Sequence, residues 1–210
     1  MKFRAFISRI WTGTKVLFPS LTLRALMRSG AGISSYTPSN ERLLLYEEAG
    51  SSLKLERFLE IGSHLGASAV VLAEVLRRRG GKKDRRVFCI DTWRNDAMSA
   101  GPRETKADFD RNTAPWAGFI EAIRGDSRTL PLPFTGECDL VFIDGDHSYE
   151  ATRADALRFA PFVRPGGRLL LHDHDRVSVA KVVGELLATG EWTVARCVGR
   201  LLSLRREEQG

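Results

Sequence analysis

The sequence of residues 57–68 is RFLEIGSHLGAS, and it predicts a strand that runs through a glycine-containing turn into a helix. The strand covers Arg57–Ile61, and Gly62 and Gly66 stand where the backbone must turn sharply or approach a ligand closely. Such a turn is typical of nucleotide sites. Because it has two glycines in the spacing Gly-x-x-x-Gly, it does not match the three-glycine dinucleotide fingerprint, and a pyrophosphate cradle is disfavoured.

Strand-like and helix-like segments alternate on both sides of this turn. Helices are predicted at 39–49, 68–79 (ended by Gly80–Gly81), 104–111, 149–160 and 177–188, and strands at 57–61, 86–90, 119–123, 139–143 and 168–171. This alternation favours a parallel sheet with helices on both faces. Two final strands, 192–198 and 201–205, are joined by Gly199–Arg200 as a terminal β-hairpin, which adds an antiparallel strand. We therefore predict an α/β, Rossmann-like, doubly wound fold.

Composition limits the classes of protein that this chain can belong to. A length of 210 residues with 43% hydrophobic content fits one globular domain and excludes intrinsic disorder. The longest apolar stretch, 61–73, is too short to span a membrane. Three scattered cysteines, Cys89, Cys138 and Cys197, support neither a disulfide framework nor a zinc site. We expect a reducing, cytoplasmic location.

The formal net charge of +6 originates in an N-terminal arm, residues 1–38. Residues 1–40 contain basic side chains and no acidic one, so the remainder of the chain is neutral and is not expected to bind nucleic acid. An apolar stripe at helical spacing predicts a short basic amphipathic helix; its members are Phe3, Phe6, Ile7, Ile10 and Trp11. We expect this arm to join a second copy of the chain into a homo-oligomer, with packing on its own domain or peripheral contact with an anionic membrane as alternatives. Residues 39–210 form the domain itself.

Acidic residues follow two further strands at positions suited to a nucleoside. The strand at 86–90 runs into Asp91, whose carboxylate can accept hydrogen bonds from both hydroxyls of a ribose. Asp126, in the turn Gly125-Asp126-Ser127, can accept a hydrogen bond from an adenine amine. Together with the glycine turn, these residues predict a cofactor that contains a nucleoside.

Ionisable residues crowd the ends of two later strands. Because parallel strands bring their carboxyl ends to one edge of the sheet, these side chains are expected to face one crevice. Such crowding is costly unless a cation or a substrate compensates it. The residues concerned are Asp144, Asp146 and His147 after one strand, and His172, Asp173, His174 and Asp175 after the other.

Taken together, these segments resemble the class I S-adenosylmethionine-dependent methyltransferases, specifically the macrocin O-methyltransferase-like group (methyltransferase family 24). The resemblance covers about residues 38–205 and is most specific at Ile143–Tyr149, at Pro165–Gly167 and at Leu171-His172-Asp173. It implies a seven-stranded sheet whose last strand is antiparallel. It also implies methyl transfer to a hydroxyl of a small molecule, with sugars and other acceptors that have vicinal oxygens as the favoured class.

The resemblance further implies roles for individual residues in binding S-adenosylmethionine. Glu60 would support the ammonium group of the cofactor, Asp91 would hold its ribose, and Asp126 would contact its adenine edge. Trp93 and Trp116 stand at the two ends of a polar segment long enough to be a lid, and Trp93 is our own candidate for stacking on the cofactor, with a place in the core as the alternative for both tryptophans. The complete predicted cofactor set is Glu60, Gly62, Ser63, Gly66, Ser68, Asp91, Trp93, Asp126 and Ser127.

The catalytic end departs from the pattern of the group. In its metal-dependent members, the aspartate that matches Asp144 and an acidic pair after the next strand bind Mg²⁺, and the histidine that matches His147 is the base. Here the acidic pair is replaced by His172-Asp173, so that a nitrogen takes the place of one oxygen ligand. We therefore predict His147 and Asp144 as catalytic residues and Asp144, His172 and Asp173 as metal ligands, with Mg²⁺, another divalent cation or no metal all left open.

Two other classes of function compete with a methyltransferase. A nicotinamide-dependent oxidoreductase is disfavoured by the missing third glycine, by the terminal hairpin and by the absence of a Tyr-x-x-x-Lys pair. A non-catalytic module, attached to a membrane or a partner through the basic arm, is disfavoured because Gly62, Gly66, Asp91 and Asp126 are all intact.

Overall fold

The computed structural model of the protein describes residues 32–51, 54–79, 85–96, 101–131 and 135–208. Most of the N-terminal arm, including its predicted amphipathic helix, lies outside these residues, as does the predicted helix end at Gly80–Gly81. Within the described residues, no helix is both long and apolar enough to cross a membrane.

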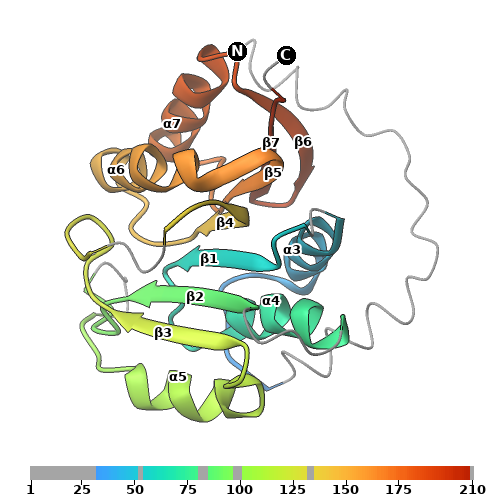
Figure 1. Ribbon diagram of the computed structural model, residues 1–210. Helices are drawn as coiled ribbons and strands as arrows, with labels where there is room; N and C mark the ends of the chain where they lie inside the picture. The colour runs from blue at the N-terminus through green and yellow to red at the C-terminus, as the bar shows by residue number, and fades with distance from the viewer. Residues whose placement is uncertain (1–31, 52–53, 80–84, 97–100, 132–134, 209–210) are drawn as a thin grey trace.

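Seven strands form one sheet in the order β3-β2-β1-β4-β5-β7-β6 (Figure 1). The first five strands pair in parallel, and β7 runs antiparallel to both β5 and β6. The predicted doubly wound sheet with an antiparallel last strand is therefore confirmed, and β7 is inserted between β5 and β6. The strands are β1 (Arg57–Ile61), β2 (Arg86–Asp91), β3 (Ile120–Arg124), β4 (Cys138–Ile143), β5 (Val163–Leu171), β6 (Trp192–Val198) and β7 (Leu201–Arg206).

Helices cover both faces of this sheet because successive strand residues point to opposite sides. Phe58 on β1 packs in the cluster that includes α3, α4 and α5, whereas its neighbour Leu59 packs in the cluster that includes α6 and α7. Figure 1 shows α6 and α7 beside the half of the sheet that contains β4 to β6. The helices are α3 (Ser39–Ser51), α4 (Ala67–Arg78), α5 (Lys106–Thr113), α6 (Tyr149–Phe159) and α7 (Val177–Ala188), with short 3-10 helices at Ala114–Trp116 and Ala160–Phe162.

The largest difference from the predicted elements is the start of β5. The sequence predicts this strand at 168–171, but it begins at Val163 and continues through Pro165-Gly166-Gly167. A side chain on Gly167 would meet the Asp139 carbonyl of the neighbouring strand, so the glycine allows the two strands to approach closely. Proline and glycine are ordinarily turn signals, which is why the prediction started the strand too late.

The turns after the parallel strands are tied directly to one another. The Gly62 amide donates to the carbonyl of Ile90 at 2.9 Å, and the Asp144 amide donates to that of Ile61 at 2.8 Å. On the next strand, the His172 amide donates to the carbonyl of Ile143 at 3.1 Å. The first residues beyond β1, β4 and β5 therefore lie side by side at one edge of the sheet.

Candidate active site

A cavity of about 800 Å³ lies at this carboxyl edge, which is a volume typical of small-molecule sites. Segment 34–37, which precedes α3, contributes to its wall, as do Arg176 and Arg200. The structure brings most of the predicted site residues together in this cavity: Gly62, Ser63, Ser68, Asp91, Asp126, Ser127, Asp144, His147, His172 and Asp173.

Three predicted cofactor residues, Glu60, Gly66 and Trp93, are outside the set that lines the cavity. Trp93 is fully buried, its ring packs against Phe109 with centroids 4.9 Å apart, and its Nε1 donates to the carbonyl of His64 at 3.0 Å. A side chain on Gly66 would press on Thr113 and Phe109 of α5. The structure thus assigns Trp93 to the core and Gly66 to the packing of α5 against the turn.

The Asp91 carboxylate is held by two backbone amides. Its Oδ2 accepts from the His64 amide at 2.7 Å, and its Oδ1 accepts from the Trp93 amide at 2.6 Å. A carboxylate has about four acceptor positions, so capacity remains for two further hydrogen bonds from a ligand in the cavity. This geometry suits a pair of vicinal hydroxyls.

Gly62 is the point at which the turn after β1 touches the turn after β4. Its φ is +86°, a conformation that favours glycine, and a side chain there would overlap the backbone of Asp144. The glycine therefore allows both turns to border one cavity.

Glu60 is fully buried at the end of β1, and neither of its carboxylate oxygens has a hydrogen-bond partner of good geometry among the described residues. Burial raises the pKa of Glu60 to about 7, and the nearby hydroxyls of Ser63 and Ser68 oppose this rise only in part. A buried carboxylate without a cation is costly, so this residue suits a ligand that brings a positive charge to the turn above it.

The end of the cavity that is predicted to hold adenine also contains Asp155, a carboxylate that the sequence analysis did not select. Asp126 pairs with Arg128 at 2.6 Å between Oδ2 and Nη2, and this contact lowers its pKa to about 2. The Ser127 hydroxyl donates to Oδ1 of Asp155 on α6 at 2.6 Å. Burial raises the pKa of Asp155 to about 6, and Asp155 lines the cavity. In the sequence, Asp155 is only an acidic residue within a predicted helix, and nothing there indicates that it faces the cavity.

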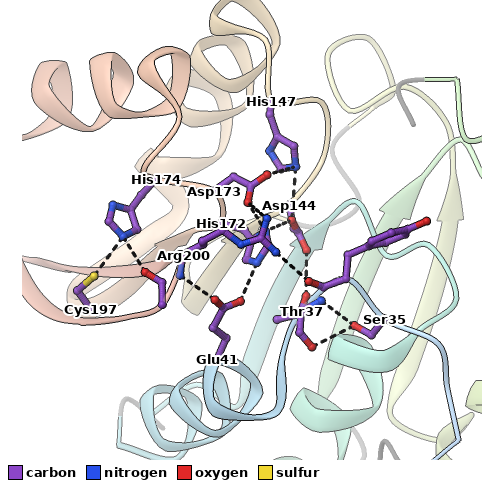
Figure 2. Close-up of polar contacts among 12 residues, drawn as sticks. Ser35, Thr37, Glu41, Asp144, His147, His172, Asp173, His174, Cys197 and Arg200 are labelled. Carbon is purple, nitrogen blue, oxygen red and sulfur yellow. Dashed lines mark hydrogen bonds and ion pairs between the residues drawn. The ribbon is translucent and has the colours of Figure 1, made fainter. Parts of the chain in front are cut away.

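The His172 ring lies between two carboxylates at the opposite end of the cavity (Figure 2). Its Nε2 is 2.9 Å from Oε2 of Glu41, and its Nδ1 is 2.9 Å from Oδ1 of Asp144. Burial opposes the charged ring, but the hydrogen bond and charge of Asp144, together with Glu41, outweigh it and raise the pKa of His172 to about 9. In the absence of another cation, this ring is protonated at neutral pH.

Glu41, in the first turn of α3, was not predicted as a site residue. It is 2% exposed, and its Oε1 accepts from the Arg200 amide at 2.7 Å. The preceding residue, Gly199, has a φ of +56°, and any side chain there would collide with Glu41. In the sequence, Glu41 is only an acidic residue within a predicted helix. Its partner, His172, is 131 residues away, so no local pattern connects the two residues.

Asp173 and His147 complete this end of the cavity. Asp173 is 2% exposed; its Oδ2 is 2.7 Å from Nε of Arg176, and its Oδ1 is 2.7 Å from Nη1 of Arg200. The Arg200 contact lacks hydrogen-bond geometry, so Oδ1 has no hydrogen-bond partner among the described residues. His147 Nε2 lies 3.4 Å from Asp173 Oδ2 and 3.9 Å from Asp144 Oδ1.

Burial lowers the pKa of His147, although the negative charges of Asp144 and Asp173 act in the opposite direction. Its ring is therefore neutral near pH 7 and can accept a proton. Two neighbours have other roles. His174 contacts Cys197 and the Gly199 carbonyl (Figure 2), and Asp146 accepts from the Ser148 amide at the start of α6.

Donor atoms for a metal ion are close together at this end. Asp144, His147 and His172 each bring one ligand atom within 4.8 Å of the others. Asp173, which was predicted as a ligand, places Oδ1 3.6 Å from Nδ1 of His172. Two of the three predicted ligands, Asp144 and His172, are in this group, whose third member is His147 and not Asp173.

A parallel sheet with an antiparallel strand inserted beside β5, and a nucleoside-type cavity at its carboxyl edge, define a class I methyltransferase. A family model described as "Methyltransferase domain" matches residues 59–174, which is more than half of the chain. The protein belongs to this family, methyltransferase family 24, whose members are S-adenosylmethionine-dependent methyltransferases.

Solved structures with the same fold include several O-methyltransferases and also an N-methyltransferase, NodS from Bradyrhizobium japonicum. The O-methyltransferase NovP is 15% identical, with a TM-score of 0.71, and the match covers 88% of this chain and 89% of NovP. TomG from Streptomyces achromogenes, solved with SAM, is 18% identical over 99% of this chain and 96% of TomG, with a TM-score of 0.61. The O-methyltransferase from Bacillus cereus, solved with SAH, is 16% identical over 99% and 98% of the two chains, with a TM-score of 0.61. At these identities the likeness establishes the fold.

Proposed function

We propose that this methyltransferase transfers the methyl group of S-adenosylmethionine to a hydroxyl oxygen of a small molecule that has vicinal oxygens. The observation that carries the proposal is one cavity lined both by the Asp91 carboxylate and by the imidazole of His147. The O-methyltransferases of the same fold support the choice of oxygen as the acceptor atom.

The cofactor fits the end formed by the turns after β1 and β2. Glu60 would offset the positive charge of its ammonium group, and Asp91, held by two backbone amides, would accept from the ribose hydroxyls. Asp155 and Ser127 offer polar atoms for the adenine edge. Because a sulfonium methyl group is already activated, placing the acceptor oxygen in line with it would supply several kcal/mol of the barrier reduction.

His147 is the proposed general base. As the acceptor oxygen bonds to the methyl carbon, the carbon–sulfur bond breaks, S-adenosylhomocysteine leaves, and the hydroxyl proton passes to the imidazole. A proton received at Nε2 would lie beside Oδ2 of Asp173 and Oδ1 of Asp144, which stabilise the resulting charge. This arrangement supports a reaction that proceeds at neutral pH.

The donor atoms of Asp144, His147 and His172, which lie within 4.8 Å of one another, support a site for a divalent cation. Asp173 Oδ1 is buried without a hydrogen-bond partner among the described residues and, like Asp144 Oδ1, approaches Nδ1 of His172. Ligation through this nitrogen would require it to give up its proton. When bound, the cation would hold two adjacent oxygens of the acceptor and lower the pKa of the attacking hydroxyl.

The proposal is tested by titrating the protein with S-adenosylmethionine and by following methyl transfer to catechols and monosaccharides. His147→Ala should lower kcat about 10²- to 10⁴-fold and leave cofactor affinity unchanged. The control is His174→Ala, whose ring contacts Cys197 outside the cavity lining and whose loss should leave kcat unchanged.

In the wild type, kcat should fall only below about pH 6.5, since burial lowers the pKa of His147. Binding of a nicotinamide cofactor in place of S-adenosylmethionine would contradict the proposal.

The free cysteines bear on the location of the protein, and its assembly stays a prediction. Cys89, Cys138 and Cys197 are free thiols, which supports the proposed reducing, cytoplasmic location. A homo-oligomer joined through the arm at 1–38, peripheral membrane contact as its alternative, and the absence of nucleic-acid binding stay predictions, since most of the arm lies outside the described residues.

A further inference from the structure

We propose that Glu41 is a positioning residue that directs Nδ1 of His172 toward Asp144 and Asp173, and that the resulting mixed nitrogen and oxygen site selects Mn²⁺ or a similar transition metal over Mg²⁺. This inference deepens the proposed function. Its test measures cation binding in the absence of any methyl acceptor, so that its failure and the failure of methyl transfer are distinguishable.

The Glu41 carboxylate is held in a fixed position by its neighbours. Its side chain is buried, one oxygen accepts from the Arg200 amide, and the other lies 2.9 Å from Nε2 of His172. The backbone at Gly199 passes directly against this carboxylate. While the ring is protonated, both nitrogens donate to a carboxylate. When a cation replaces the proton on Nδ1, the hydrogen on Nε2 would stay directed at Glu41 and Nδ1 would become the ligand. Proteins usually orient a metal-ligating imidazole in this way, with the ring nitrogen that does not bind the metal donating to a carboxylate.

Figure 2 shows the geometry around Nδ1 of His172. This nitrogen lies 2.9 Å from Oδ1 of Asp144 and 3.6 Å from Oδ1 of Asp173. Two ligands that are each about 2.1 Å from one ion, at angles between a right angle and a tetrahedral angle, are separated by about 3.0–3.5 Å. Nδ1 of His172 therefore lies at about the spacing of an adjacent ligand from each aspartate oxygen, and Asp144, His147 and His172 each bring one ligand atom within 4.8 Å of the others.

Asp173 gives an independent sign that this point receives a ligand. Asp173 is 2% exposed, and its Oδ1 has no partner with hydrogen-bond geometry among the described residues, although Nη1 of Arg200 lies 2.7 Å away. Asp173 also has a φ of +52°, an uncommon conformation for a residue with a side chain. Strained residues with unsatisfied buried atoms are concentrated at functional sites, where a ligand supplies the missing contact.

The chemistry of the donors bears on which cation the site selects. Mg²⁺ favours oxygen ligands and strong negative charge, whereas imidazole suits Mn²⁺, Fe²⁺, Co²⁺ and Zn²⁺ better. Arg176 and Arg200 offset part of the charge of Asp173, which weakens the site further for a hard cation. The nitrogen of His172 then contributes a larger share of the affinity, and its contribution favours the transition metals.

The experiment uses the full chain and compares Mn²⁺ with Mg²⁺ by titration calorimetry, and detects bound Mn²⁺ by electron paramagnetic resonance. The wild type should bind Mn²⁺ at least 10-fold more tightly than Mg²⁺ and show nitrogen hyperfine coupling. Glu41→Ala should lower Mn²⁺ affinity 10- to 100-fold, and Glu41→Gln, which keeps an acceptor oxygen, should recover most of the loss. His172→Asp should abolish the nitrogen coupling and shift the preference toward Mg²⁺.

The matched control is Glu48→Ala. Glu48 is on the same helix, is also buried, and pairs with Arg168 rather than with His172, so its loss should disturb α3 without changing Mn²⁺ affinity. Three results would overturn the inference: wild-type protein that binds Mn²⁺ no more tightly than Mg²⁺, Glu41→Ala with unchanged affinity, or His172→Asp with unchanged preference. If the wild type binds neither cation, His172 is a structural ion pair between Glu41 and Asp144, and the inference is likewise overturned. Methyl transfer in excess chelator would then leave the proposed function intact.

Discussion

The two ends of the cavity are built in different ways. In the cofactor half, formed by the turns after β1, β2 and β3, Asp91 is held by the backbone amides of residues 64 and 93, which are 27 and 2 positions away. In the reacting half, formed by the turns after β4 and β5 and the start of α3, His172 is held by side chains, and Glu41 is 131 positions away.

This difference bears on the departure that the sequence resemblance implied, a histidine at position 172 where an acidic residue is expected. Backbone amides are present whatever the side chains are, so the cofactor half depends on a few glycines and one aspartate. A site made of side chains can exchange one donor for another, as His172 in place of an acidic residue illustrates. If the site binds a cation, as proposed, such an exchange would change the cation that it prefers and leave the fold unaffected. The three predictions below test whether the two halves are separable.

The largest effect is expected from Gly62→Ala, because Gly62 is where the halves touch. The added methyl group would overlap the Asp144 backbone, and φ is +86°. Overpacking and strain together should lower the free energy of unfolding by about 3 kcal/mol and Tm by about 6–12 °C. Binding of S-adenosylmethionine should be lost together with cation binding, as measured by thermal unfolding and calorimetry.

The control for this variant is Gly184→Ala in α7, where a side chain would meet nothing within 4 Å. It should stabilise the helix by about 0.5–1 kcal/mol and leave both ligands bound. A Gly62→Ala protein with normal Tm would show that the two turns can move apart, and the comparison would lose its structural basis.

A smaller and one-sided effect is expected from Asp91→Ala. Removing a charged acceptor for buried hydroxyls should weaken binding of S-adenosylmethionine by on the order of 1.5–3 kcal/mol, or roughly 10- to 150-fold in Kd. Cation affinity should be unchanged, since the donors of the reacting half do not contact Asp91. Asp110→Ala, an exposed aspartate that pairs with Lys106 on α5, is the control and should change neither affinity. An equal loss of cation binding in Asp91→Ala would mean that the halves are coupled.

The smallest effect concerns pH and Glu60. Because burial raises the folded-state pKa from 4.5 to about 7, the folded protein holds this proton more tightly than the unfolded chain does. The contribution of Glu60 to stability is therefore highest below pH 4.5 and is lost as pH rises toward 7. Glu60→Gln should remove this loss, on the order of 2 kcal/mol or less, when urea unfolding is compared at pH 4.5 and pH 8.

The same substitution should weaken S-adenosylmethionine at pH 8, since the amide cannot offset the ammonium charge of the cofactor. Glu121→Gln, at an exposed position on β3, provides the baseline. If the wild type and Glu60→Gln lose equal stability between the two pH values, the protonation of Glu60 does not contribute to the pH dependence of folding.

Local patterns in the sequence were sufficient for much of the fold and for the positions of the turns. The helix Val177–Ala188 and the strand Trp192–Val198 have the bounds that were predicted, because apolar periodicity and flanking turn residues act over a few positions. The residues after each strand were predicted as neighbours from the rule that parallel strands share a carboxyl edge. β5 was the exception, since its early part contains residues that ordinarily end a strand.

The sequence by itself determined the order of strands and helices along the chain, the glycine turn and most of the predicted side chains that reach the cavity, because each of these depends on residues close together in the chain. Only the tertiary structure decided that Trp93 supports the core, that Asp155 joins the adenine end, and that Glu41 holds His172. These contacts join segments whose separation in sequence carries no periodic signal. Their distances are set by how α3 and the β6–β7 hairpin pack against the sheet, and a buried charge reveals its partner only when that packing is known.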